Sequence, residues 1–254
     1  MAGALATKGY ERYDLVSALT VDDLWGRYAE LRSAFADLPP DPYGAGLNRY
    51  RRYAAAILLP WQLSVHWLPS TYDPALADQV LRYYQGDYNG EHPGAVRNFP
   101  ALPVEVLRNP LLEAIVLFDF AQTDWPPAYA MSPFYVGVHF IKLRARRAGE
   151  RGMTSPNCLH QDGEPFHFAH LVERSNAVGG ENVIGELGCL GMLPDEAPEK
   201  ELIDRFTLTE PLEAYGIRDD RVSHHLEPIT KGDGSAPGLR TAILVDITPM
   251  RKDI

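Results

Sequence analysis

The 254-residue sequence contains few cysteines and no long apolar run. Its two cysteines, Cys158 and Cys189, are too few for a disulfide framework, and no CxxC pair is present to hold zinc. No apolar stretch approaches the roughly 18 to 20 residues of a membrane-spanning helix. The first residues include acidic and aromatic side chains where a signal peptide needs an unbroken apolar segment. We therefore expect a cytoplasmic protein without a membrane partner.

Positive charge is also scarce. The chain has 24 lysines and arginines against 34 aspartates and glutamates, which gives a formal net charge of −10. A surface of that sign repels the phosphates of nucleic acids and of anionic lipids. We therefore expect an enzyme or a binding protein with no nucleic-acid partner.

Glycine and proline, by contrast, are abundant, with 21 residues of each, which predicts many turns. Hydrophobic residues make up 45% and charged residues 23% of the chain. These proportions are ordinary for a globular protein and exclude a disordered or coiled-coil chain. No repeat or linker divides the sequence, so we expect one domain over residues 1–254, either as a monomer or as a homodimer.

The first 130 residues carry the helical signals and are expected to form a mainly helical buttress with short strands. Thr20 and Asp23 resemble a capping box ahead of apolar residues at helical spacing, and Asp73 precedes a proline as at a helix start. The predicted helices cover residues 20–38, 73–86 and 110–125, and the predicted strands cover 52–59 and 62–68.

After about residue 131 the pattern changes to short apolar segments separated by Gly, Pro, Asn and Asp. These predicted strands cover residues 135–145, 164–173, 181–187, 205–208, 223–229 and 241–247. A run of strands without intervening helices is typical of an antiparallel sandwich or barrel, with helices packed on one outer face.

The strongest local signal is the tripeptide from His160 to Asp162. Residues two apart on an extended segment project to the same face, so this imidazole and this carboxylate can reach one metal ion together. A histidine on another strand, at 224 or 225, would complete a site of two histidines and one carboxylate, which leaves iron positions open for small ligands. The alternative is a solvated turn that ends at Gly163.

Arg240 opens the last apolar strand. Its planar guanidinium can hold a carboxylate through two parallel charge-assisted hydrogen bonds. A surface ion pair is the structural alternative for this arginine.

The order of four motifs is similar to that of a known family. HxDG at residues 160–163 precedes RSNAVGGE at 174–181, HxLxPI at 224–229 and GxR at 238–240. With YNGEHPGAVRNFPAL and VGVHFIKLRA upstream, this order resembles bacterial 2-oxoglutarate/Fe(II) dioxygenases that include free L-amino acid hydroxylases such as isoleucine hydroxylase. The resemblance implies a mainly β protein with N-terminal helices. Its core would be a double-stranded β-helix, a jelly-roll or cupin-like barrel, in which residues 131–250 carry the metal site.

The resemblance also assigns roles residue by residue. His160, Asp162 and His224 match the Fe(II) ligands, and Arg240 matches the arginine that binds the far carboxylate of 2-oxoglutarate. Arg251 is the weaker alternative to Arg240. Related halogenases have a small residue in place of the carboxylate that Asp162 retains, so the resemblance implies hydroxylation rather than halogenation.

Other polar residues are candidates for binding the organic ligands. His139 alternates with apolar residues and either lines the 2-oxoglutarate pocket or is a hydrogen-bonded core residue. An amino acid substrate needs a cation for its carboxylate, which Arg97 or Arg174 would supply unless they form structural ion pairs. Asn176, in the same motif as Arg174, is a further candidate for substrate binding.

Three more histidines are expected to lie outside the metal site. His167 and His170 are three apart on one strand and therefore face opposite ways, so both cannot join one metal cluster. His225 should point away from the face that His224 uses.

The resemblance implies an enzyme that hydroxylates a free L-amino acid or close derivative, with Fe(II) as cofactor and 2-oxoglutarate and O2 as co-substrates. Succinate and CO2 would be the co-products. Two alternatives stay open: an oxidase of the same fold that desaturates or cyclises an amino acid, and a non-catalytic barrel that binds a metabolite.

Overall fold

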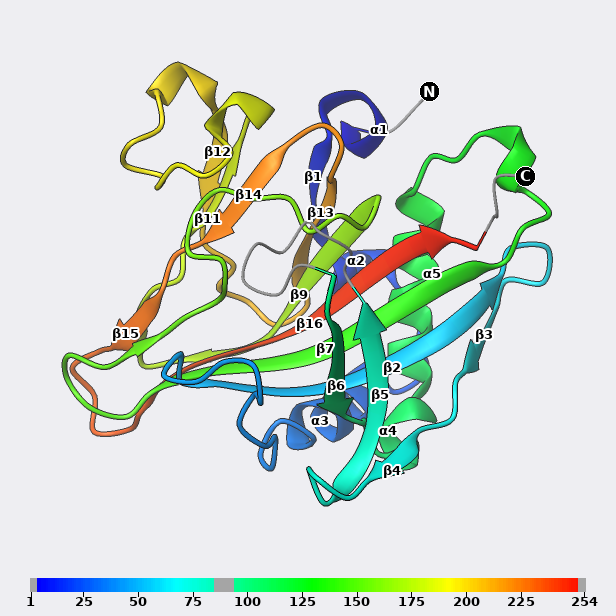
Figure 1. Cartoon of the computed structure of the whole chain (residues 1–254), viewed down its shortest axis with the longest axis horizontal. Coiled ribbons are helices and arrows are strands. Elements are labelled where there is room, and N and C mark those ends of the chain that lie inside the picture. Colours follow the sequence, from blue (N-terminus) through cyan, green and yellow to red (C-terminus); the bar gives the residue numbers. More distant parts are fainter. Residues whose placement is uncertain (1–3, 85–93, 251–254) are drawn as a thin grey trace.

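A large antiparallel sheet dominates the computed structural model, which describes residues 4–84 and 94–250 (Figure 1). The strand order in this sheet is β1-β13-β9-β16-β7-β2-β3. In that order the strands are β1 (Tyr10–Asp14), β13 (Glu213–Arg218), β9 (Phe166–Ser175), β16 (Gly238–Pro249), β7 (Phe134–Ala145), β2 (Arg49–Leu59) and β3 (Ser64–Trp67). The C-terminal strand β16 lies at the centre, because it pairs with both β7 and β9.

Two three-stranded sheets lie beside the large one. The first has the order β12-β11-β14 and the second the order β10-β15-β8. Their strands are β12 (Leu202–Phe206), β11 (Asn182–Gly185), β14 (Ser223–Leu226), β10 (Ala177–Gly179), β15 (Ile229–Lys231) and β8 (Arg151–Gly152). Side chains of β14 and of the large sheet line one cavity, so these layers face each other across it.

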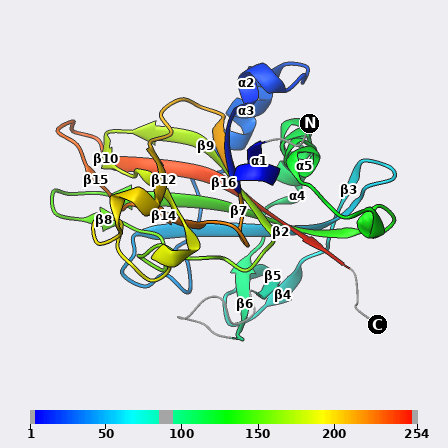
Figure 2. The ribbon, with the colours of Figure 1, turned by 90° about the horizontal axis from the view of Figure 1, so that it is seen from above.

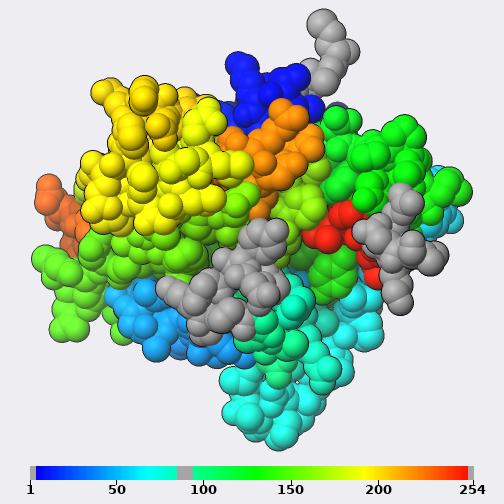
Figure 3. Space-filling view, turned by 45° about the horizontal axis from the view of Figure 1, so that its top comes forward, coloured from blue at the N-terminus to red at the C-terminus, as the bar shows by residue number. Residues whose placement is uncertain are grey.

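A third small sheet packs against β2 and has the order β4-β5-β6. It consists of β4 (Thr71–Asp73), β5 (Asp78–Tyr84) and β6 (Val96–Pro100). Its inner face joins Tyr83 and Phe99 to Tyr53 of β2 in one aromatic cluster. In the space-filling view, β4 and β5 (cyan) project from one side of the molecule, and the segment around β12 (yellow) lies on the opposite side (Figure 3).

The helices cover the face of the large sheet that is opposite the cavity (Figure 2). They are α1 (Ala4–Lys8), α2 (Leu15–Ala18), α3 (Leu24–Ser33), α4 (Val104–Leu107) and α5 (Pro110–Gln122). Short 3-10 turns lie at residues 127–129 and, near β11 and β12, at 187–189 and 199–201. Helix α5 begins where Asn109 accepts a hydrogen bond from the Leu111 amide (2.9 Å) and Pro110 fills the first helical position. Its buried face contributes to the main hydrophobic core.

Alternation along the long strands separates this core from the cavity. In β16, Ile243 and Val245 pack in the core below the helices, whereas Leu244 and Asp246 line the cavity. The other long strands of the sheet follow the same two-residue period. The face of the sheet opposite the helices is therefore free to carry polar residues.

The strands near 52–59 and 62–68, the helix starting at Pro110 and most strands expected in the second half of the chain are confirmed. The strand expected over 205–208 corresponds to the end of β12, and strand β13 of the large sheet was not predicted. The helix expected over residues 20–38 is shorter and covers Leu24–Ser33.

The expectation of a helix over residues 73–86 is wrong. Asp73 accepts a hydrogen bond from the Ala75 amide (2.8 Å), which forms a turn rather than a helix cap, and Ala77 has a left-handed backbone (φ 51°). Strand β5 follows and pairs with β6, so that Tyr83 lies opposite Arg97. Residues 85 and 86 of the expected helix lie outside the described residues.

The first half was expected to be mainly helical with short strands, but β1 to β6 lie there beside α1 to α5, and β2 is a long strand of 11 residues. Strand β2 belongs to the large sheet itself, with register Tyr53 opposite His139. In the described part of the chain, no helix has the length and apolar character needed to cross a membrane.

Candidate active site

A short strand contact brings the two predicted histidine ligands together. His160 and His224 form an isolated antiparallel bridge, in which the amide of each donates to the carbonyl of the other at 3.0 Å. Their rings are consequently neighbours, with centroids 4.3 Å apart. His160 Nδ1 donates to the Cys158 carbonyl at 2.8 Å, and this bond orients Nε2 toward Asp162.

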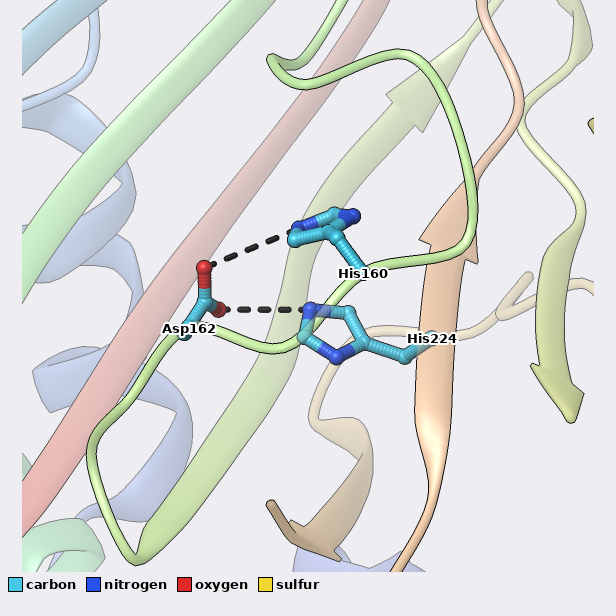
Figure 4. A group of neighbouring side chains, drawn as sticks. All are labelled: His160, Asp162 and His224. Carbon is cyan, nitrogen blue, oxygen red and sulfur yellow. Dashed lines mark ion pairs between the residues drawn. The ribbon is translucent and has the colours of Figure 1, made fainter. Parts of the chain in front are cut away.

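Asp162 completes the cluster (Figure 4). Its Oδ1 lies 3.6 Å from His160 Nε2, and its Oδ2 lies 3.2 Å from His224 Nε2. The ligand atoms of the three residues all lie within 4.8 Å of one another. The structure therefore brings together the three residues that the sequence singled out.

The electrostatics of the cluster suit a divalent cation. Burial lowers the pKa of His224 to about 4, so its imidazole is neutral and has a free lone pair. Burial opposes the charge on Asp162, but His224 and His160 hold the pKa of that carboxyl well below its usual range. Two imidazole nitrogens and one carboxylate fit Fe(II) and leave coordination positions open.

Asp219, which sequence reasoning missed, fixes the loop that carries Asp162. Its carboxylate accepts hydrogen bonds from the amides of Asp162 (3.0 Å) and Gly163 (2.8 Å), and Gln161 donates to its carbonyl. Gly163 has a left-handed backbone (φ 91°), which glycine adopts without strain. Because Asp219 is distant in sequence from this loop, no local motif could have revealed its role.

A second polar row lies beside the triad on three adjacent strands. Asp246 in β16 bonds His167 Nδ1 of β9 at 2.5 Å and His139 Nε2 of β7 at 3.1 Å. His167 Nδ1 is also 3.7 Å from Asp162 Oδ2, and its ring stacks on that of His224. His139 lines the cavity and is also a buried, hydrogen-bonded residue, so it has features of both alternatives that the sequence left open. Sequence reasoning missed Asp246.

The expected opposite orientation of His167 and His170 is confirmed. His170 lies on the core side, fully buried, where its Nε2 contacts Asp119 of α5 at 2.9 Å. His167 faces the cavity, where its links to Asp246 and Asp162 make it part of the surroundings of the triad.

The cavity contains all three triad residues. Three other residues that the sequence predicted for the site, His139, Arg97 and Arg240, also line this cavity. The cavity wall between the triad and Arg240 is apolar. It is formed by Ala169, Ala242, Leu244, Ile141 and Leu226.

Arg240 is a buried cation that lacks a carboxylate partner among the described residues. Its exposed fraction is 4%, and its Nε atom has no hydrogen-bond partner within the described ranges 4–84 and 94–250. Burial lowers the pKa of Arg240 to about 10, so it is still charged at neutral pH. Tyr215, which sequence reasoning also missed, lines the cavity close to it. The sequence alternative of a surface ion pair does not apply to Arg240.

The structure does not bring Arg174 or Asn176 into the cavity. Arg174 donates to the carbonyls of Ala177 (3.0 Å) and Gly179 (2.6 Å), and Asn176 accepts from the Gly234 amide (3.0 Å). Arg174 Nη2 and the Asn176 side chain thus bind local backbone and organise the loops next to β16. Arg251 lies outside the described residues.

A jelly roll with two histidines and one carboxylate at its cavity defines a mononuclear non-haem metal enzyme. A family model described as 2OG-Fe dioxygenase matches residues 32–246, and the chain belongs to this family. Fe(II) and 2-oxoglutarate are accordingly its cofactor and co-substrate.

Similarity to individual proteins agrees with this family. The chain is 25% identical over 227 residues to the 3(1)-hydroxy-L-isoleucine 4-dioxygenase of Pantoea ananatis (strain AJ13355), covering 88% of this chain and 82% of that protein. It is 32% identical over 158 residues to the L-isoleucine-4-hydroxylase of Bacillus thuringiensis, covering 61% of this chain and 60% of that protein.

A solved structure confirms the predicted fold class. A bsmA homolog from Methylobium petroleophilum PM1 matches with a TM-score of 0.73 at 18% identity, over 98% of this chain and 92% of that one.

We expect His160→Ala, Asp162→Ala and His224→Ala each to weaken binding of one Mn(II) ion per chain, measured by calorimetry. The loss of Mn(II) affinity should exceed roughly 10- to 100-fold, which is the cost of removing a residue that only hydrogen-bonds to a metal ligand. His225→Ala should keep the metal, because His225 follows His224 on β14 and does not line the cavity. Retention of metal by His224→Ala and its loss in His225→Ala would show that the ligand assignment on β14 is wrong.

Proposed function

We propose that this chain hydroxylates a free L-amino acid or a close derivative, using Fe(II) and 2-oxoglutarate. The buried guanidinium of Arg240 is the observation that carries the proposal. Since no carboxylate among residues 4–84 and 94–250 pairs with this cation, it needs an anionic ligand, and 2-oxoglutarate has a carboxylate at each end. The names of both sequence relatives specify isoleucine or hydroxyisoleucine as substrate, which supports an amino acid substrate here.

In this proposal, His160, Asp162 and His224 hold the iron from one side. When bound, Fe(II) supplies with O2 the oxidation of a substrate C–H bond, while 2-oxoglutarate is converted to succinate and CO2. The residues of the chain bind and orient the reactants. Asp219 keeps Asp162 in place through the two amide bonds described above.

Arg240 would bind the far carboxylate of 2-oxoglutarate through its guanidinium. The apolar residues between Arg240 and the triad, such as Leu244 and Leu226, would exclude water from the chain of the co-substrate. His139 belongs to the wall of the same cavity, where Asp246 fixes its ring. Arg97 is the predicted substrate-binding cation that lines this cavity.

The homodimer, the lack of nucleic-acid and membrane partners and the cytoplasmic location stay predictions of the sequence.

Replacement of Arg240 by alanine tests the co-substrate site. The variant leaves the far carboxylate of 2-oxoglutarate without its partner, at a cost of about 2 to 5 kcal/mol. We expect the affinity for 2-oxoglutarate to fall by about 30-fold or more, at 1.4 kcal/mol per decade. The measurement is an anaerobic titration of the Fe(II) enzyme, followed by its visible charge-transfer band.

Two controls accompany this titration. Mn(II) affinity should change little in Arg240→Ala, because Arg240 lies outside the triad. Arg240→Lys should recover only part of the loss, because an ammonium lacks the bidentate geometry. Unchanged 2-oxoglutarate affinity in Arg240→Ala would remove this residue from the site.

A screen of the twenty L-amino acids for succinate release tests the reaction itself. With Fe(II), 2-oxoglutarate and O2, we expect at least one amino acid to raise succinate release above the substrate-free rate and to gain one oxygen atom by mass. A product lighter by two hydrogens would indicate desaturation or ring closure instead. Absence of succinate with every amino acid would contradict the hydroxylase.

A further inference from the structure

A second group of cations lines the cavity away from Arg240. Arg51 of β2 and Arg97 of β6 both contribute to the wall. Arg51 lies opposite Ile141 of β7, whose other neighbour is Ala242 of β16. Strand β7 therefore separates the arginines at the β2 end from Arg240 on β16, so the cavity has cations at two separate places.

Arg51 is poorly satisfied by its protein partner. Asp41 Oδ2 lies 2.7 Å from Arg49 Nε but 3.4 Å from Arg51 Nε, and the other Asp41 oxygen accepts from the Tyr43 amide at 2.8 Å. The side chain of Arg51 is 12% exposed, and its buried Nε has no hydrogen-bond partner in the described part of the chain. Asp41 is thus hydrogen-bonded to Arg49 and to the backbone, and its ion pair with Arg51 lacks a hydrogen bond.

Arg97 faces the same region from β6. Its guanidinium carbon lies 4.9 Å from the centre of the Tyr83 ring and 5.5 Å from that of Phe99. The guanidinium carbon of Arg51 lies 4.7 Å from the same Phe99 ring. One aromatic ring thus positions both cations. Burial, and in addition the charge of Arg51, lowers the pKa of Arg97, as expected for two like charges close together.

We propose that Arg51 and Arg97 form a carboxylate subsite for the substrate, separate from the co-substrate site at Arg240. Two guanidiniums that contact one aromatic ring and line one cavity wall favour the binding of a carboxylate there. This inference rests on the proposed function and deepens it. The subsite selects amino acids with a free carboxylate and rejects carboxamides and residues within a peptide chain.

A thermodynamic cycle between protein and ligand tests the subsite. Calorimetry under anaerobic conditions measures the binding of L-isoleucine and L-isoleucinamide to the Mn(II)-loaded, 2-oxoglutarate-saturated protein. We expect the amide to bind at least tenfold more weakly than the acid. In Arg51→Met, the affinity for the acid should fall by about 30-fold, whereas the affinity for the amide should change by less than about threefold. This variant should therefore lose the preference for the acid over the amide. Arg97→Met should act in the same direction.

A second ligand pair identifies which carboxylate is bound. L-Glutamate and L-glutamine differ only in the side-chain carboxylate. A preference for glutamate that disappears in Arg51→Met assigns the subsite to a side-chain carboxylate, whereas a preference confined to the isoleucine pair assigns it to the α-carboxylate. Either result supports the subsite.

Arg52 provides a matched control on the same strand. Its guanidinium donates to the Ala101 carbonyl (2.7 Å) and pairs with Asp78 (3.1 Å), and it does not line the cavity. Arg52→Met should keep the preference for the acid. Arg51→Lys, which retains the charge, should keep part of the preference for the acid. The affinity for 2-oxoglutarate should stay within about twofold of wild type in every variant at position 51, which shows that these variants still fold.

Three outcomes would overturn the subsite: equal binding of acid and amide by the wild type in both pairs, an equal loss of acid and amide in Arg51→Met, or no binding of any of these ligands. The proposed function is judged by a different signal. Binding of the acid without succinate release in air would refute the hydroxylase and keep the subsite. Succinate release with equal use of acid and amide would keep the hydroxylase and refute the subsite.

Discussion

The two-residue alternation of the long strands in the large sheet is the constraint on which the site depends. In β9, Phe166 and Phe168 pack in the core on the helix side, whereas His167 and Ala169 line the cavity. A slip of one residue would exchange these two sets and place charges in the core. The apolar packing under α3 and α5 therefore also fixes the position of every cavity residue on these strands, Arg240 included.

Charge inside the cavity is arranged in separate groups. The carboxylates of Asp162 and Asp246 lie among histidines, and the pKa of each is held low despite burial, so that each stays charged. Arg240 and Arg51, in contrast, lack a hydrogen-bonded carboxylate among the described residues. Burial of such cations is costly unless an anion arrives. The unsatisfied cations are therefore suited to organic carboxylates, and the carboxylate at position 162 is suited to a metal ion.

How much the sequence predicts depends on whether the signal is local. His160 and Asp162 share a tripeptide, and the order of four motifs located His224 and Arg240, so the triad and the buried arginine were found. Short apolar segments between turn residues likewise located most strands of the second half, but not β8, β10 or β13. The segment 73–86 failed because its pairing with β6 overrides a local helix signal. Residues such as Asp219 and Arg51 owe their roles to contacts between distant segments, which no local pattern records.

The central claim is that the triad and Arg240 together hold a metal and 2-oxoglutarate in one cavity. A crystal structure of the anaerobic protein with Mn(II) and 2-oxoglutarate tests it most directly. The account predicts one metal ion bound by His160, Asp162 and His224, with the far carboxylate of 2-oxoglutarate within hydrogen-bond distance of the Arg240 guanidinium. A metal bound elsewhere, or that carboxylate bound at Arg51 and Arg97 instead, would contradict the account.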